Sequence, residues 1–104
     1  MVQARKAVRG STSGRPIMAL FDVLGQRWTM RILWELRDGA TNFRALRERC
    51  DDVSPTVLNR RLKELRNMDL VSLTDEGYAY TSWGKELSAQ LAKLTVWSER
   101  WAAR

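Results

Sequence analysis

Apolar residues recur every three or four positions along most of the chain, which is the spacing of amphipathic helices. The first helix begins at Pro16, since a helix's first turn does not use the N–H that proline lacks, and it ends at Gly25. The second runs through "RWTMRILWELRDG" and stops at Gly39. The third, "NFRALRERC", takes Thr41 as its N-cap. Three helices in succession are therefore predicted for the first half of the chain.

The second of these helices has two apolar sides. Trp28, Ile32 and Leu36 form one stripe, while Met30 and Trp34 lie on another side. A helix that is apolar on two sides is expected to be buried on both. Other predicted core residues come from the later segments: Phe43, Leu46, Leu58, Leu62, Leu65 and Leu70.

Residues 54–68 form a fourth helix with one apolar and one basic face. Ser54 is a favourable N-cap, and Pro55 suits the first helical position. The apolar face holds three leucines that fall within about 60° of one another at 100° per residue. Polar side chains cover the opposite side, namely Thr56, Asn59, Arg60, Lys63 and Asn67, with Arg61 and Arg66 at the borders. This face is either an ordinary solvated surface or a surface for an anionic partner.

Two short runs, "LVSL" and "YAYT", have the β-branched and aromatic residues of strands. "TDEG" between them predicts a turn, with Gly77 available for positive φ. The pair forms a small hairpin, which must pack on the helices because a two-stranded hairpin is not stable alone.

A final helix is predicted from Thr81, its N-cap, to about Ala103. This helix is about 30 Å long, and it carries a long apolar stripe: Trp83, Leu87, Leu91, Leu94, Trp97 and Trp101. One small domain cannot cover such a stripe, and an exposed stripe would promote aggregation. A two-fold dimer would cover it on both copies.

The order of these elements predicts a mainly α fold with a small β-hairpin. Only "DDVS" separates the third and fourth helices, and two short helices so joined indicate a helix-turn-helix. A hairpin directly after them is a wing. The chain is therefore predicted to have a winged helix-turn-helix domain over residues 16–104, preceded by a disordered basic arm over residues 1–15.

Composition narrows the possible functions. The net charge is +6, and four basic residues of the arm with no acid supply +4 of it. The arm either contacts DNA or only aids solubility.

There is no His and one Cys, so we expect no metal site, no cofactor and no intrachain disulfide. No nucleophile–base set or phosphate-binding glycine loop is present, so an enzyme is not expected. No run is apolar enough for a membrane helix, and we expect a cytoplasmic, nucleoid-associated protein.

Four segments in order resemble those of the HxlR-type regulators, relatives of the MarR group. They are "VLGQRWTMRILWEL", "GATNFRALRERC", "VSPTVLNRRLKELRNMDLV" and "YAYTSWGKEL". The resemblance runs from about Pro16 to Trp101. It implies a bacterial, dimeric, DNA-binding repressor or activator, whose recognition helix enters the major groove of an inverted-repeat operator.

The resemblance also implies which residues meet each partner. The DNA-facing positions are Ser54, Thr56, Asn59, Arg60 and Lys63. N- and C-terminal helices form the dimer interface, which here would contain Ile17, Leu87, Leu91, Leu94, Trp97 and Trp101.

The residue types assign roles on the DNA face. Arg60 and Asn59 are candidates to read guanine and adenine, because both side chains can bond two base-edge atoms at once. Lys63 and Ser54 are candidates to hold phosphates. Thr56 can offer its methyl group to thymine or its hydroxyl to phosphate. Phosphate contacts are also considered for four other arginines: Arg44, Arg47, Arg27 and Arg31.

The chain departs from the family pattern at three places. Family members that sense oxidants usually carry a Cys just before the first-helix proline, and here that residue is Arg15. Asn42 stands where the family often has Arg. The wing tip is Asp75-Glu76, and these carboxylates would repel phosphate.

Three alternatives remain open at this stage. The domain could mediate protein–protein contact in a larger assembly. The tryptophans could line a pocket for a small-molecule effector between the first, second and last helices, near Met18, Phe21, Trp34 and Trp97, although core and dimer packing explain them more simply. Cys50 could be a sensor, although a buried structural thiol is favoured.

Overall fold

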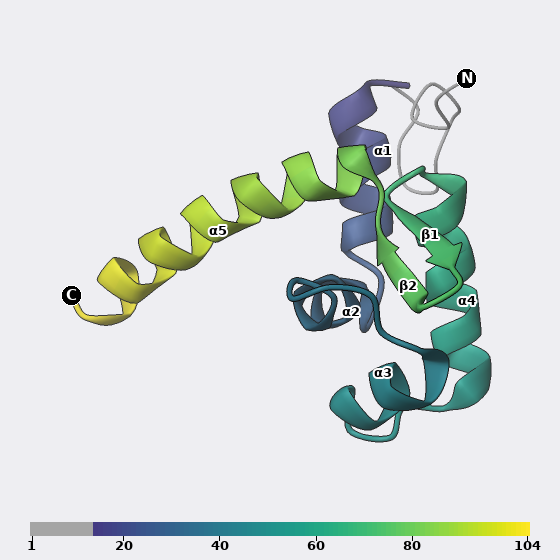
Figure 1. Cartoon of the computed structure of the whole chain (residues 1–104). Coiled ribbons are helices and arrows are strands. Elements are labelled where there is room, and N and C mark those ends of the chain that lie inside the picture. The colour runs from purple at the N-terminus through teal and green to yellow at the C-terminus, as the bar shows by residue number, and fades with distance from the viewer. Residues whose placement is uncertain (1–13) are drawn as a thin grey trace.

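The computed structural model describes residues 14–104, so the predicted arm over residues 1–15 falls almost entirely outside the described residues. Five helices and one antiparallel hairpin follow one another within these described residues (Figure 1): α1 (Pro16–Leu24), α2 (Thr29–Glu35), α3 (Phe43–Arg49), α4 (Pro55–Asn67), β1 (Val71–Thr74), β2 (Gly77–Tyr80) and α5 (Ser82–Ala102). The predicted order of elements is confirmed. None of the helices in this described part is long and apolar enough to cross a membrane.

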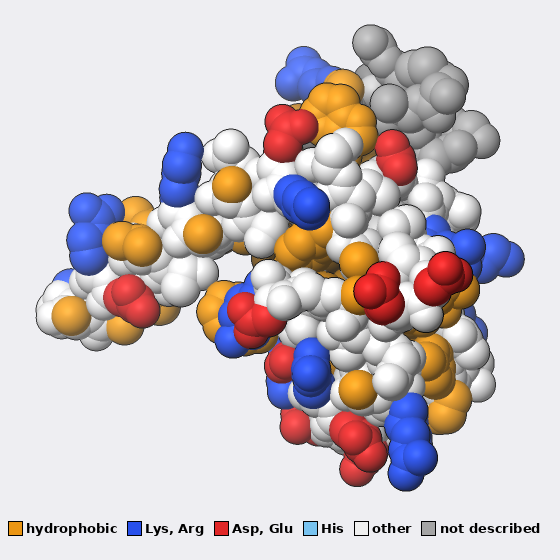
Figure 2. All heavy atoms as spheres, in the orientation of Figure 1, with side chains coloured by type: hydrophobic (Ala, Val, Ile, Leu, Met, Phe, Trp, Pro, Cys, Tyr) orange, Lys and Arg blue, Asp and Glu red, His pale blue; other side chains and the backbone are white. Residues whose placement is uncertain are grey.

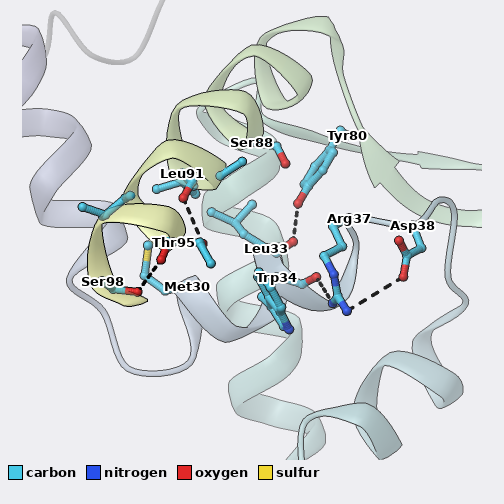
Figure 3. A pocket seen from close by; sticks show the side chains of 12 residues that line it. Met30, Leu33, Trp34, Arg37, Asp38, Tyr80, Ser88, Leu91, Thr95 and Ser98 are labelled. Atoms are coloured by element: carbon cyan, nitrogen blue, oxygen red, sulfur yellow. Dashed lines mark hydrogen bonds and ion pairs between the residues drawn. The ribbon is translucent and has the colours of Figure 1, made fainter. Parts of the chain in front are cut away.

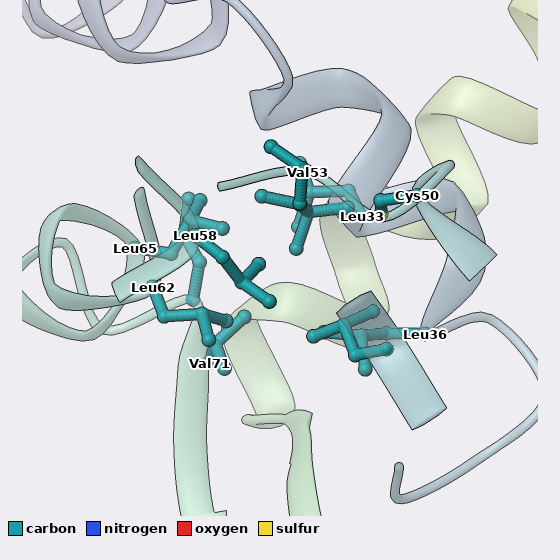
Figure 4. Packing of buried hydrophobic residues seen from close by; sticks show 11 residues of the cluster. Leu33, Leu36, Cys50, Val53, Leu58, Leu62, Leu65 and Val71 are labelled. Carbon is teal, nitrogen blue, oxygen red and sulfur yellow. The ribbon is translucent and has the colours of Figure 1, made fainter. Parts of the chain in front are cut away.

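Side chains from α2, α3, α4 and β1 meet in one hydrophobic core (Figure 4). Leu58, Leu62 and Leu65 of α4 are at most 1% exposed, as the helical spacing predicted. Burial of each such leucine contributes about 1.5–3 kcal/mol. Predicted core residues Trp28 and Phe43 are half-buried and pack against this cluster from its edge. The core therefore fixes α4 by its apolar face and leaves its polar face outward.

The predicted bounds of α2 were wrong at both ends. The helix begins at Thr29, because Trp28 takes a left-handed conformation with φ 78°, which costs of order 1–3 kcal/mol for a residue other than glycine. It ends at Glu35, before the predicted stop at Gly39. Its second apolar side is not enclosed, since Met30 is 40% and Trp34 is 47% exposed. These two side chains face a hollow beside α5 instead of the core.

The predicted N-cap of α3 was also wrong. Asn42 caps the helix, and its side chain accepts a hydrogen bond from the Ala45 N–H at 2.8 Å. Thr41 instead pairs with Tyr78 of the hairpin, exchanging two backbone hydrogen bonds of 2.9 and 2.8 Å. The predicted caps Ser54 and Thr81 are confirmed for α4 and α5.

The hairpin pairs Val71 with Tyr80 and Thr74 with Gly77. Gly77 has φ 121°, and a Cβ there would lie 2.5 Å from the backbone carbonyl carbon of Thr41. Only glycine permits this close approach, so the wing is held against the start of α3.

Helix α5 leaves the body of the molecule and projects away from it (Figure 1). Leu87 and Leu91 in its first half pack against the core. Farther along, Leu94, Trp97 and Trp101 are 54%, 50% and 51% exposed. The second half of the apolar stripe therefore has no cover within the described part of this chain.

Candidate nucleic-acid interface

The outer face of α4 displays the predicted DNA-facing residues together. Thr56, Asn59, Arg60 and Lys63 are all exposed along it, and Ser54 precedes them at its N-terminus. The Ser54 oxygen accepts a hydrogen bond from the Val57 N–H at 3.4 Å, which leaves the hydroxyl proton available to a phosphate oxygen. The five candidate residues thus lie on one continuous surface.

The positive charges on this face are available to a partner. Arg60, Lys63 and Arg66 form no ion pair with any residue that the structure describes. Arg44 on α3 has a side chain that is 91% exposed, and its contact with Glu48 is 3.9 Å long. Such a contact between exposed groups contributes little, so Arg44 also stays available.

Arg31 and Arg47, considered above as phosphate contacts, instead hold the fold together. Arg31 bonds Glu35 at 2.8 Å and Asp51 at 3.2 Å. Arg47 donates from Nε to the Val53 carbonyl at 2.7 Å. Neither guanidinium is directed to the outer face of α4 in this arrangement.

The turn of the helix-turn-helix is built without glycine. Asp51 and Asp52 adopt left-handed conformations with φ 56° and 57°, which Asp tolerates better than most residues. The Asp52 N–H donates to the Arg47 carbonyl at 3.0 Å. Together with the Arg47–Val53 bond, this contact fixes the angle at which α4 leaves α3.

A polar groove separates α4 from the hairpin. Lys63, Arg66 and Asn67 line one wall, and Ser72 and Leu73 of β1 line the other. Arg66 had been placed only at the border of the helix. The sequence shows that Arg66 is basic, but its exposure beside β1 depends on how the hairpin packs against α4.

The tip of the wing is acidic. Asp75 and Glu76 are exposed at the turn, and Figure 2 shows acidic side chains over the end of the hairpin with Lys and Arg side chains along the neighbouring edge. The outer face of α4 is therefore bordered by negative charge on the wing side.

A second hollow lies between α2 and α5 (Figure 3). It measures about 510 Å³, and its lining includes Leu33, Trp34, Tyr80, Leu91 and Leu94. Of the four residues expected near an effector pocket, Trp34 lines this hollow, and Met18, Phe21 and Trp97 lie outside its lining.

Polar groups at this hollow are held by neighbours. The Arg37 guanidinium lies 4.0 Å from the centre of the Trp34 ring. The Tyr80 hydroxyl donates to the Leu33 carbonyl, and burial raises the pKa of Tyr80. Tyr80 therefore stays neutral at physiological pH.

The predicted dimer residues divide into two groups. Leu87 and Leu91 are half-buried on the core of their own chain. The other four are about half exposed: Ile17, Leu94, Trp97 and Trp101. The Trp97 and Trp101 rings stack with their centres 6.0 Å apart.

Cys50 is fully buried at the end of α3. Burial raises the pKa of its thiol. A protonated, enclosed thiol is a poor nucleophile, which supports the structural interpretation of this residue.

Comparisons with known proteins agree with the geometry. The family model described as HxlR-like helix-turn-helix matches residues 23–104. The HTH-type transcriptional regulator YodB of Bacillus subtilis is 29% identical over 98 residues, covering 88% of this chain and 88% of that protein. An HTH-type transcriptional regulator of Methanocaldococcus jannaschii is 28% identical over 88 residues, covering 81% and 83%.

Solved structures share the fold. The crystal structure of quinone-bound YodB superposes with a TM-score of 0.74 at 30% identity, covering 81% of this chain and 96% of that chain. A MarR-family transcriptional regulator from Enterococcus faecalis gives a TM-score of 0.75 at 22% identity, covering 93% and 94%. The predicted winged helix-turn-helix fold is thereby confirmed.

Proposed function

The chain belongs to the HxlR-like helix-turn-helix family and is a transcriptional regulator of that type rather than an enzyme, and we propose that it binds DNA as a homodimer on an inverted-repeat operator. The observation that carries this proposal is the outer face of α4. This face exposes Arg and Asn side chains, each able to make two hydrogen bonds to one base, beside cations that have no ion pair within the described chain.

Each residue of that face has a distinct task in the proposed complex. Arg60 reads a guanine and Asn59 an adenine through two hydrogen bonds each. Lys63, Ser54 and the more distant Arg44 hold phosphates and set the register of α4 in the major groove. Thr56, near the N-terminus of α4, contacts a thymine methyl group or the backbone.

The homodimer is supported by the uncovered stripe of α5. Leu94, Trp97 and Trp101 are each about half exposed, and a soluble monomer rarely leaves such a contiguous apolar surface open. A two-fold axis would bury the stripe against its copy, together with Ile17 of α1. It would also set two α4 helices about 34–36 Å apart, one turn of DNA, or a multiple of that distance.

The first test is selection of binding sites from a random duplex pool, followed by titration of the selected site and a scrambled duplex over a range of salt concentrations. We expect an enriched inverted repeat that binds at least about a thousandfold more tightly than the scramble. Weak, salt-dependent binding with no enriched motif would leave only the phosphate contribution. That result would contradict the proposal and favour a winged-helix domain for protein–protein contact.

The dimer has its own test. Leu94→Glu and Trp97→Glu should each give monomers in sedimentation experiments, because a carboxylate in the apolar interface would be desolvated without a partner. Ala89→Glu, on the exposed opposite side of α5, is the matched control and should remain dimeric. Dimers of all three variants would exclude this interface.

We also propose that the hollow between α2 and α5 holds a small apolar effector. Its size falls within the range of ligand pockets, about 300–1,000 Å³, and its lining is mainly apolar. YodB has been solved with a quinone bound, so quinones are the first compounds to test by thermal shift. A shift lost in Trp34→Ala, which removes one wall, would support the site; a shift equal in both proteins would exclude it.

A further inference from the structure

Arg61 differs from the other basic residues of α4. Its side chain is only 11% exposed, whereas Arg60, Lys63 and Arg66 point to solvent. The Arg61 guanidinium donates from Nε to the Arg27 carbonyl at 2.8 Å, and from Nη1 to both Glu64 carboxylate oxygens at 3.0 and 3.2 Å. This arginine is therefore directed into the molecule and away from the proposed DNA surface.

The carbonyl that Arg61 bonds lies in the connection between α1 and α2. Gly25 is the C-cap of α1, and Trp28 turns the chain through a left-handed conformation into α2. No backbone N–H of the described residues donates to the Arg27 carbonyl. Arg61 thus supplies the hydrogen bond that the irregular start of α2 leaves unmade at the Arg27 carbonyl.

The guanidinium is suited to this link because it is rigid and planar. Nε and Nη1 donate in fixed directions, so one group can bond Arg27 and Glu64 at the same time. The Glu64 carboxylate balances the charge of Arg61 within the same helix. The contact therefore fixes the rotation of α4 about its own axis relative to the α1–α2 connection.

We infer that Arg61 is a positioning residue that sets the orientation of the recognition helix relative to α1, and so determines the spacing between half-sites that the regulator accepts. This inference rests on the proposed homodimer and operator. Ile17 and Phe21 of α1 are 46% and 55% exposed, which puts α1 on the surface available to the second copy. The link runs from that surface through the α1–α2 connection to α4.

The test uses the full chain and the operator found by selection. Arg61→Met keeps most of the aliphatic side chain and removes the guanidinium, and Arg66→Met is the matched control on the exposed side of α4. Affinities are measured for operators with zero, one or two base pairs inserted between the half-sites, and for base substitutions within a half-site. Circular dichroism first confirms that both variants are folded.

We expect the wild type to bind operators of one spacing more tightly than the others. In Arg61→Met the ratio of affinities between that spacing and the others should fall about tenfold, because a charge-assisted hydrogen bond no longer fixes α4. Its base preference within a half-site should remain. Arg66→Met should weaken all spacings alike. Arg61→Lys, which can still donate to the Arg27 carbonyl, should recover part of the spacing preference and carries the test if Arg61→Met does not fold.

An unchanged spacing profile in the folded Arg61 variant would overturn the inference while leaving the proposed function intact. Loss of both the base preference and the spacing preference would also overturn it, since Arg61 would then be shaping the outer face of α4 itself. Failure of the wild type to select any operator would instead contradict the proposed function.

Discussion

Gly84 in the first turn of α5 lies directly against the backbone of Leu70, so that a Cβ on Gly84 would be 2.0 Å from the Leu70 carbonyl oxygen. The same Cβ would lie 3.1 Å from Cβ of Tyr80. Gly84 is also the only buried residue of α5. This contact joins α5 to the open end of the hairpin, opposite the wing tip.

Gly84→Ala should destabilise the protein, although Gly→Ala within a helix usually stabilises by about 0.5–1 kcal/mol. The methyl group would push α5 away from Leu70, and overpacking of this kind costs about 1–3 kcal/mol. Urea unfolding at fixed protein concentration measures the change. Lys93→Ala, an exposed substitution on the same helix, should change the free energy of unfolding by less than about 0.5 kcal/mol. A Gly84→Ala protein as stable as the wild type would show that α5 is not held at this point.

Arg60→Ala and Lys63→Ala should affect DNA binding in different ways. Loss of a bidentate guanine contact should cost about 1–3 kcal/mol and relax preference at one base pair. Loss of a phosphate contact should weaken all duplexes alike and lower the slope of log K against log salt by about 1. Titration of single-base operator variants at several salt concentrations separates the two effects. Identical, unchanged affinities for every duplex would refute the assignment of the α4 face.

Removing the charges of the wing tip should strengthen DNA binding without changing specificity. Asp75→Asn combined with Glu76→Gln abolishes the repulsion between two exposed carboxylates and nearby phosphates, which we expect to raise affinity for every duplex by about two- to fivefold. The gain should shrink at high salt because the charges are solvent-exposed. Glu99→Gln near the end of α5 is the control and should have no effect. Weaker binding of the double variant would mean that the wing tip contacts the bases or the protein itself.

The Cys50 thiol should be unreactive in the native state and should make stability depend on alkaline pH. Burial raises its pKa above that of the unfolded chain, which is about 8.5. The contribution is fully present below the unfolded pKa and is lost as pH rises through the folded pKa, because the unfolded thiol ionises first. Unfolding at pH 7.5 and 9.5 should therefore show a larger loss of stability for the wild type than for Cys50→Ala. Rapid labelling of native Cys50 by a thiol reagent would contradict the buried, structural assignment.

Much of the fold follows from local signals. Pro16, Ser54 and Thr81 mark the starts of α1, α4 and α5 because proline and side-chain caps act on the residues that directly follow them. The apolar spacing of α4 was sufficient to assign both of its faces. The exposure of the residues proposed to face DNA could therefore be predicted from sequence.

The errors arose where a distant partner decides the outcome. Thr41 was expected to cap α3, but pairing with Tyr78 places it in the sheet and leaves Asn42 as the cap. Arg31, Arg47 and Arg61 are chemically like Arg60, and only the folded structure shows that they bond backbone carbonyl groups of their own chain. No periodicity of the sequence encodes such contacts.

The projecting half of α5 has a consequence for how the regulator would respond to its own abundance. If the apolar stripe is covered only in the dimer, the pairing equilibrium and the folding equilibrium are linked, and the melting temperature should rise with protein concentration. Below the dissociation constant of the dimer, the amount of dimer grows with the square of the monomer concentration. Operator occupancy would then change more steeply than protein level, so a small change in synthesis or degradation would switch the target promoter over a narrow range.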